Sequence, residues 1–426
     1  MTSTDIGRTL YGSPLSRPKV TKFAVIALAV LVVICTSFIV KDILTPLTPD
    51  ALRVFFLALL WGGLLSIIPL AVLWFLDRRE HETIWLYVLA VLWGALIATA
   101  IAKPINDLIF NGVSQFLTVH PDIQQMLGDN AKIAIAAPLA GPIVEETTKG
   151  LGLLLLFWLL RSEFDNVRDG FIYGALVGIG FNFLEAPFYV AKVFTETGVA
   201  PWGGQLAMRH SLLGLGGHAL YTGLFGLGLG LSRQTTRPWL RYVAPVVGWL
   251  LGFSAHLVNN GIGLLVTLII VLSGGKAAAS TKGVVPIDPP VWVGLLQGSL
   301  QNAILLFPFV LITVVMLWQS GIWERTVIRE QLADETEPVI TPEEYEGVKG
   351  DRIFRTRRIP GYTRRISTAI VKAQDELAFR KWRVQQQGRD VNADALVISW
   401  RDELTRLRET NQAIATGTGT IERKGL

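Results

Sequence analysis

Long apolar runs separated by short polar connections occupy most of the first three quarters of the sequence. At about 1.5 Å per residue, each run is long enough to cross a hydrocarbon core about 30 Å thick. The pattern therefore predicts an all-α fold: a polytopic transmembrane helix bundle of about eight spans, followed by a charged, partly helical cytoplasmic C-terminal tail. The expected spans cover residues 23–40, 51–76, 84–102, 132–161, 170–194, 207–231, 242–272 and 291–318.

The composition agrees with a membrane protein, because 51% of the residues are hydrophobic and only 17% are charged. Basic residues gather at alternate connections, and the positive-inside rule then places both termini in the cytoplasm. The net charge of +5 is read as this topology signal, and no nucleic-acid partner is expected. A single cysteine, Cys35, lies inside the first apolar run and provides neither a disulfide nor a thiolate metal site.

The change from apolar to charged sequence divides the chain into five expected segments. The last of them, from residue 321 onward, holds half of all acidic residues and nearly half of the basic ones. In order, the segments are a cytoplasmic N-terminal segment (1–22), three spans with their loops (23–130), a catalytic four-helix core (131–272), a loop with the eighth span (273–320) and the cytoplasmic tail (321–426).

The fourth apolar run carries three charged residues near its centre, Glu145, Glu146 and Lys149. Placing such groups in a bilayer costs several kcal/mol, so they are functional candidates by default. Lys149 follows Glu145 by four residues, so the two side chains share one face of a helix and can pair. Pairing lowers the cost without explaining why the charges are there.

The three following spans bring polar side chains to a comparable depth. The fifth span has Gly170, Gly174 and Gly178 at four-residue spacing, which lets a neighbouring helix approach closely. The same span then carries Asn182 and Glu185, the sixth carries His218, and the seventh carries His256, Asn259 and Asn260. Counting helical rise, these groups and Glu145 lie roughly 15–24 Å from the outer ends of their spans, near the middle of the bilayer.

Carboxylates and imidazoles that converge in this way can activate water. Two histidines and a carboxylate suit a divalent metal, for which zinc is the expected ion, with His218, His256 and Glu185 as ligands. Glu145 or Glu146 would then be the general base, supported by Lys149, Asn182, Asn259 and Asn260. Water activation by a Glu/His pair without metal remains open.

Other functions were weighed against hydrolysis. A proton- or ion-coupled transporter could use the same intramembrane Glu, Lys and His residues, although transporters often show broken helices in two matching halves and this chain does not. Two histidines on separate helices could bind haem, but haem would leave the glutamates without a task. A scaffold acting through its tail is a third alternative. His81 and His120 fall in expected loops and are read as solvated.

Taken together, the motifs resemble the PrsW family of intramembrane proteases. They are Glu145-Glu146-x-x-Lys149, Arg168-Asp169-Gly170, Gly178-x-Gly-Phe181-x-x-x-Glu185, His218, and His256-x-x-x-Asn260. More distantly, they are similar to the CAAX-prenyl and bacteriocin-processing intramembrane proteases, in which the middle motif ends in His rather than Glu. The resemblance covers roughly residues 130–265.

The resemblance implies a multi-pass endopeptidase of a bacterial plasma membrane, often treated as a metalloprotease, that acts on membrane-anchored proteins. In the family this includes the first cut of an anti-sigma factor in regulated proteolysis. Carried over by position, Glu145 and Glu146 match the essential carboxylates, Glu185 the middle acid, and His218 and His256 the two imidazoles. One position departs from the family pattern: Ala186 stands where an asparagine is expected.

Overall fold

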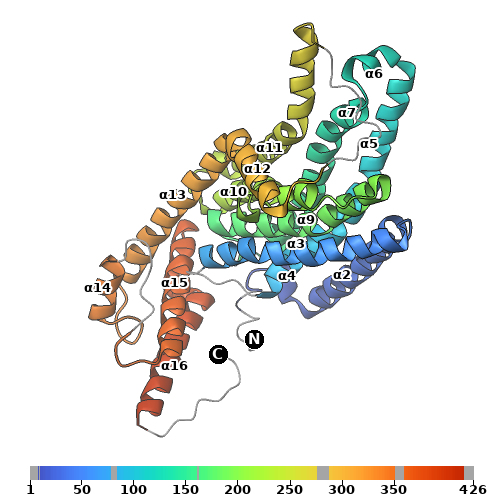
Figure 1. Cartoon of the computed structure of the whole chain (residues 1–426). Helices are drawn as coiled ribbons and strands as arrows, with labels where there is room; N and C mark the ends of the chain where they lie inside the picture. The colour runs from blue at the N-terminus through green and yellow to red at the C-terminus, as the bar shows by residue number, and fades with distance from the viewer. Residues whose placement is uncertain are drawn as a thin grey trace.

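The computed structural model describes residues 8, 10–77, 84–160, 163–275, 287–350 and 359–416, and these residues form helices, turns and irregular connections (Figure 1). His81, most of the expected loop at 273–290 and the Gly/Thr-rich end of the tail lie outside the described residues. The helices, in chain order, are α2 (Pro18–Ile39), α3 (Pro49–Leu76), α4 (Ile84–Leu92), α5 (Thr99–Val119), α6 (Pro121–Leu127), α7 (Ala131–Ala140), α8 (Glu146–Leu159), α9 (Val167–Thr197), α10 (His218–Gln234), α11 (Pro238–Leu272), α12 (Val291–Leu305), α13 (Phe307–Leu332), α14 (Pro342–Gly350), α15 (Arg364–Gln386) and α16 (Ala395–Ala415).

The predicted polytopic helical membrane protein is confirmed. Within the described residues, 6 helices are long and apolar enough to cross a membrane. They are Pro18–Leu44, Pro49–Leu76, Ile84–Val119, Val167–Thr197, Pro238–Leu272 and Phe307–Leu332. The third is much longer than the expected span at 84–102, because the helix continues through the following polar residues to Val119.

Two of the expected spans take a different form, and both carry site residues. The run at 132–161 forms α7 and α8, joined by the wide π turn η4 (Gly141–Glu145), and it holds three charged residues at its centre. The run at 207–231 forms a continuous α-helix only from His218, because the backbone before it adopts left-handed conformations at Leu212, Leu213, Gly214 and Gly217. The expected eighth span is likewise broken at Leu306, between α12 and α13.

Hydrogen bonds between helix ends show which ends lie together. The side chain of Ser13 donates to the carbonyl of Leu159 at the end of α8, and the amide of Val167 at the start of α9 donates to Gln234 at the end of α10. These contacts bring the N-terminal segment and the turns α8–α9 and α10–α11 to one end of the bundle. In Figure 1 the tail helices α14 to α16 lie at this end, and α5, α6 and α7 reach the opposite one.

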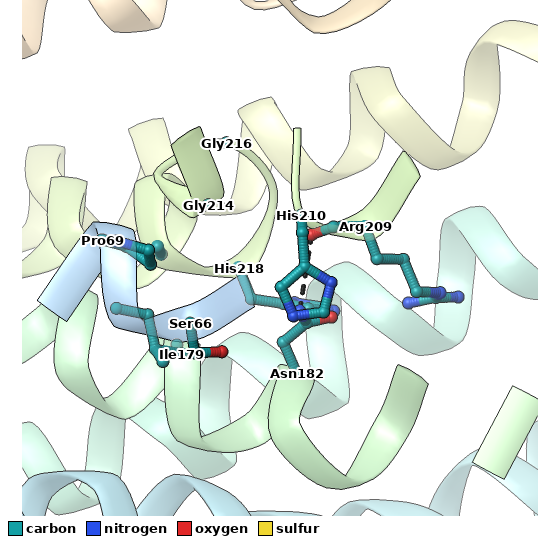
Figure 2. Close-up of a pocket in the computed structure, with 11 residues that line it drawn as sticks. Ser66, Pro69, Ile179, Asn182, Arg209, His210, Gly214, Gly216 and His218 are labelled. Atoms are coloured by element: carbon teal, nitrogen blue, oxygen red, sulfur yellow. Dashed lines mark hydrogen bonds between the residues drawn. The ribbon is translucent and has the colours of Figure 1, made fainter. Parts of the chain in front are cut away.

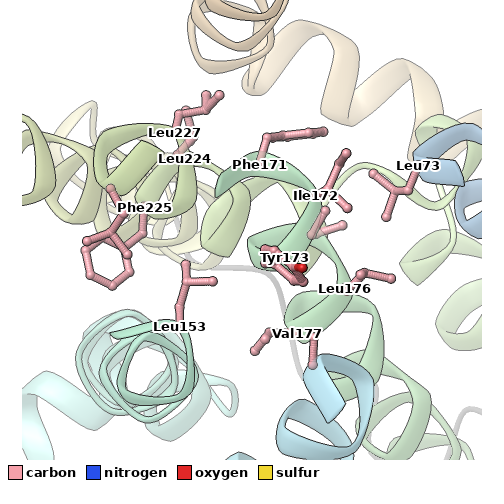
Figure 3. Close-up of a cluster of buried hydrophobic side chains, with 14 of the residues drawn as sticks. Leu73, Leu153, Phe171, Ile172, Tyr173, Leu176, Val177, Leu224, Phe225 and Leu227 are labelled. Atoms are coloured by element: carbon pink, nitrogen blue, oxygen red, sulfur yellow. The ribbon is translucent and has the colours of Figure 1, made fainter. Parts of the chain in front are cut away.

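Helix α9 is the centre of the bundle and packs against α10, α3, α4 and α8. Most of its first half is buried, and its apolar residues meet side chains of α8 and α10, including Leu153 and Leu224 (Figure 3). The glycine stripe makes this packing close. A Cβ added at Gly174 would lie 2.4 Å from the carbonyl oxygen of Thr222 on α10, so only glycine fits.

The tail has a hydrophobic core of its own, formed by α13 to α16, with Ile370, Leu377 and Leu404 fully buried. Helix α13 runs without interruption from the bundle into this unit, so the boundary expected at residue 321 falls inside a helix. Arg8 lies against α16, bonding to Ser399 and stacking on Trp400, which joins the tail to the N-terminal segment.

Candidate active site

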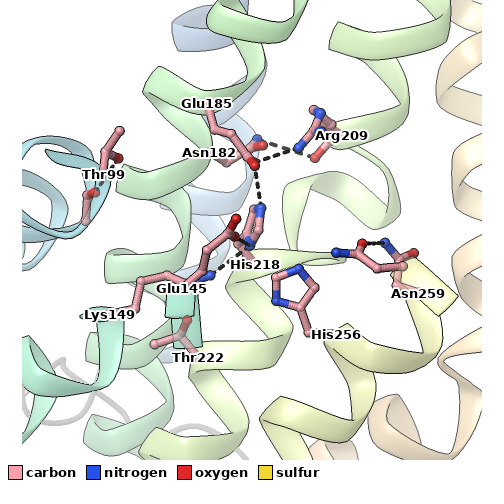
Figure 4. A network of polar contacts seen from close by, with 12 residues as sticks. Thr99, Glu145, Lys149, Asn182, Glu185, Arg209, His218, Thr222, His256 and Asn259 are labelled. Atoms are coloured by element: carbon pink, nitrogen blue, oxygen red, sulfur yellow. Dashed lines mark hydrogen bonds and ion pairs between the residues drawn. The ribbon is translucent and has the colours of Figure 1, made fainter. Parts of the chain in front are cut away.

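The paired glutamates lie at the π turn between α7 and α8. Pro142 inside this turn lacks a backbone N–H, and a π turn locally widens the helix, a geometry common at functional sites. Glu145 ends the turn and Glu146 begins α8, and both side chains are buried. Their surroundings are supplied by α5, α9, α10 and α11, so five parts of the chain meet here (Figure 4).

Glu146 is the best-connected carboxylate of the site. Its Oε1 lies 2.5 Å from Nζ of Lys149 and 2.9 Å from Nδ1 of His256, and its Oε2 accepts from the hydroxyl of Thr222 at 3.0 Å. Lys149 is fully buried, so its ammonium depends on these contacts. The pairing of a glutamate with Lys149 was predicted; its partner is Glu146, one turn before, rather than Glu145.

His218 lies between two oppositely charged neighbours. Its Nε2 is 2.7 Å from Oε2 of Glu185, and its Nδ1 is 2.8 Å from Nζ of Lys149. A carboxylate only accepts hydrogen bonds and an ammonium only donates them, so Nε2 carries the hydrogen and Nδ1 presents its lone pair. The same oxygen of Glu185 also pairs with Arg209 at 2.6 Å, so Glu185 fixes the orientation and tautomer of His218.

Glu145 differs from the other two carboxylates because one of its oxygens is buried without a hydrogen-bond partner among the described residues. Its Oε1 accepts from Nδ2 of Asn106 on α5 at 2.9 Å. Its Oε2 is buried, has no hydrogen-bond partner among the described residues, and lies 4.0 Å from Nδ1 of His218. A buried carboxylate oxygen without a donor is costly, and its presence indicates a ligand position.

Three carboxylates and two cations make up the charge of the site. Glu145, Glu146 and Glu185 face Lys149 and Arg209, so one negative charge remains when both imidazoles are neutral. This residual charge favours a bound cation over an anion.

One buried group has the geometry of a metal site. Ligand atoms of Glu145, His218 and His256 all lie within 4.8 Å of one another. Two imidazoles and a carboxylate are a donor set that zinc accepts, and the unpaired Oε2 of Glu145 fits the role of a ligand. The ammonium of Lys149 competes for the lone pair on Nδ1 of His218, so metal binding there requires Lys149 to keep only its contact with Glu146.

The supporting residues predicted from the sequence have separate places. Asn182 donates to the backbone carbonyl of Arg209 at 3.4 Å, beside Glu185. Asn260 donates to the carbonyl of Ala137 at 3.2 Å and so holds α11 against α7, while Asn259 contacts Asn260.

Sequence reasoning missed two residues that contact the carboxylates, Asn106 and Arg209. Asn106 lies where a polar connection was expected, so it was not considered for the site. Arg209 was read only as a topology signal, although Gln205 one turn earlier, which accepts from its Nε at 3.4 Å, hinted at a polar helix face.

Comparison with known proteins supports the same region. The family described as PrsW family intramembrane metalloprotease matches residues 82–286. A relative named Protease PrsW, from Geobacillus kaustophilus (strain HTA426), is 28% identical over 131 residues, which are 28% of this chain and 54% of the relative. The chain thus spans about half the length of that relative. No solved structure matches the chain. All the polar residues described above lie inside the matched segment, so it is over residues 82–286 that the chain is similar to the PrsW family.

Proposed function

We propose that this chain is an intramembrane endopeptidase that cleaves membrane-anchored proteins with metal-activated water. The observation that carries the proposal is the buried group of Glu145, His218 and His256, supplied by three different elements in the middle of a membrane bundle. The match to a metalloprotease family over these residues supports it. A metal bound there would lower the pKa of its water and polarise the scissile carbonyl.

The carboxylates divide between holding the metal and moving protons. Glu145 takes the place of Glu185 in the expected ligand set, because its Oε2 is unpaired whereas both Arg209 and His218 bond to Glu185. Glu146 is then the general base, since its carboxylate lies beside both imidazoles. The base accepts the proton of the attacking water and returns it to the leaving amine.

Lys149 and Thr222 position this base. Their donors hold both oxygens of Glu146 and leave it a single orientation toward the histidines. Once a proton is on Glu146, the ammonium of Lys149 no longer faces a carboxylate there and can donate to the developing oxyanion instead.

We propose zinc as the metal and the plasma membrane of a bacterium as the location. Contacts between Arg8 and α16 support a common side for the described N- and C-terminal parts, and the positive-inside rule supports the cytoplasm as that side. The resemblance extends the substrate class to regulatory membrane-anchored proteins such as an anti-sigma factor.

The test is proteolysis by the purified protein in lipid nanodiscs, on a panel of single-span membrane proteins. Wild type is compared with Glu145→Gln, Glu146→Gln and His218→Ala, and Glu196→Gln serves as the matched control because its carboxylate is exposed on the same helix as Glu185. Bound metal is counted in each variant by mass spectrometry.

We expect Glu145→Gln and His218→Ala to lose both metal and cleavage. Glu146→Gln should keep the metal and lose cleavage, since a general base typically accelerates a reaction by roughly 10²–10⁴-fold. Glu196→Gln should match wild type. Cleavage that survives in all three site variants would refute the assigned site, and cleavage by metal-free wild type would refute the metal.

A further inference from the structure

A second polar recess lies beside His218, on the side away from Glu146. It is formed by α3, α9 and the irregular segment that precedes α10 (Figure 2). Its polar lining comes from Ser66, Asn182, His210 and His218, together with the backbone around Gly214 and Gly216. None of the hydrolytic steps proposed above uses His210, which was also not singled out in the sequence.

His210 turns an unpaired nitrogen into this recess. The residue is only 4% exposed, and its Nδ1 lies 2.8 Å from the carbonyl oxygen of Leu206. A carbonyl accepts, so Nδ1 carries the hydrogen and Nε2 presents a lone pair. Among the described residues, Nε2 has no hydrogen-bond partner.

Asn182 presents a second unpaired acceptor to the same recess. Its Nδ2 donates to the backbone carbonyl of Arg209, the residue before His210, so the two side chains are neighbours. Its Oδ1 is buried and likewise lacks a donor within the described part of the chain. Two acceptors without donors therefore line one small recess in a membrane bundle, where lipid offers no hydrogen bonds.

The irregular backbone around the recess also favours a polar occupant. The segment before α10 has left-handed residues at Leu212 and Leu213, so its backbone groups are not all paired as in a helix. In a membrane protein, non-helical backbone is tolerated where it is buried in protein or lines a water-filled cavity. Gly214 and Gly216 of this segment line the recess together with Ser66 and Pro69.

We propose that this recess binds water and delivers it to His218. A water molecule has two donors, one for Nε2 of His210 and one for Oδ1 of Asn182, and buried waters typically make about three such bonds. A metal cation is disfavoured because the lining includes Arg209, whose positive charge lies close by, paired with Glu185. Delivery to a hydrolytic reaction rests on the proposed function, whereas water binding does not.

The experiment is X-ray hydroxyl-radical labelling of the full-length protein in nanodiscs prepared in ¹⁸O water. Radicals form from water and oxidise adjacent side chains, so labelling reports water rather than lipid. In wild type, Ile179, which is 6% exposed, should be labelled several-fold faster than Ile67, which is 58% exposed but on an outward face of α3. Asn182→Leu and His210→Phe should each reduce labelling of Ile179 several-fold, while the matched control His120→Phe, at an exposed position, should not.

Labelling of Ile179 at or below that of Ile67 would overturn the proposal, and so would labelling that is unchanged in both recess variants. Size-exclusion chromatography and thermal unfolding verify that each variant is folded. Cleavage is measured on the same samples: slower turnover with unchanged metal content in Asn182→Leu supports delivery, and unchanged turnover refutes it. A wild type that is labelled at Ile179 yet binds no metal and cleaves nothing would leave the water site standing and remove the proposed function.

Discussion

Replacing Gly178 by alanine tests whether close packing of α9 against α10 positions the active site. A Cβ at Gly178 would lie 2.2 Å from the carbonyl oxygen of His218 and 2.7 Å from the amide of Ala219. Ordinary contact begins at 3.4 Å, so the start of α10 must move by about 1.2 Å. Both atoms belong to the backbone, so no side chain can rotate away to relieve the overlap.

This displacement has a predictable size and place. Overpacking of this kind typically costs about 1–3 kcal/mol of stability. The first residue that moves is His218 itself, and a shift of roughly 1 Å in a catalytic group can cost on the order of 10²-fold in rate. We therefore expect Gly178→Ala to lose far more activity than its loss of stability alone explains.

Two other glycines serve as matched controls. Gly170 lies two turns earlier in the same stripe, and its added Cβ would meet the carbonyl oxygen of Gly226 at 2.0 Å, at the far end of the interface. Gly263 on α11 has no atom within 4 Å of an added Cβ. Gly170→Ala should destabilise the protein as much as Gly178→Ala but spare the position of His218, and Gly263→Ala should be neutral or slightly stabilising.

The assay combines thermal unfolding with the affinity for zinc, determined by chelator competition, and with turnover. Gly178→Ala should weaken zinc binding more than Gly170→Ala when the two are compared at equal loss of stability. If both variants lose metal affinity in proportion to stability, the stripe only holds the bundle together and does not place His218. Wild-type stability in Gly178→Ala would refute the packing itself.

Two further predictions concern residues whose partners are known from the structure. Asn106→Leu removes the donor that orients Glu145 at 2.9 Å and should weaken zinc binding by about 10–100-fold in chelator competition, with little change in Asn411→Leu, a half-buried control in the tail. In the tail, burial raises the pKa of Glu344, but hydrogen bonds from Arg408 and Gln374 outweigh it and hold the pKa below the usual value near 4.3. The stabilisation from these hydrogen bonds is therefore present above about pH 4.3 and is lost as the pH falls through the pKa of Glu344 in the folded state. In wild type, the amide hydrogens of α14 and α16 should exchange faster at pH 3.5 than at pH 5.5, after correction for intrinsic exchange rates. Glu344→Gln should reduce this difference between the two pH values.

The sequence predicted those features that are determined within a single helix: its position, the face that packs and the depth of its polar residues. Apolar length located the long spans, and four-residue spacing placed Gly174 and Gly178 on the face that packs. It also predicted a comparable depth for Glu145, Glu185, His218 and His256, and in the structure His218 bonds to Glu185 and lies with His256 beside Glu145. Such periodic signals are local, so a single sequence carries them.

What the sequence did not predict depends on contacts between elements. The pairing of Arg209 with Glu185 joins residues on two helices whose relative rotation no pattern encodes. Asn106 was missed because polar residues along α5 resembled a connection, although the helix continues there and Asn106 reaches Glu145. The segment before α10 was read as helix because its composition is apolar, whereas tertiary contacts, such as Asn302 donating to Ser211 at 2.5 Å, help to stabilise its irregular backbone.

The two cations explain how three carboxylates persist in the bundle. Removing one partner of a buried pair typically costs about 3–5 kcal/mol, so Lys149 and Arg209 are needed to keep Glu146 and Glu185 ionised in place. Glu145 receives no such partner, only the amide of Asn106. A purely structural polar network would have no reason to leave that oxygen unpaired next to two imidazoles, whereas a cation site requires one negative charge that the protein itself does not neutralise.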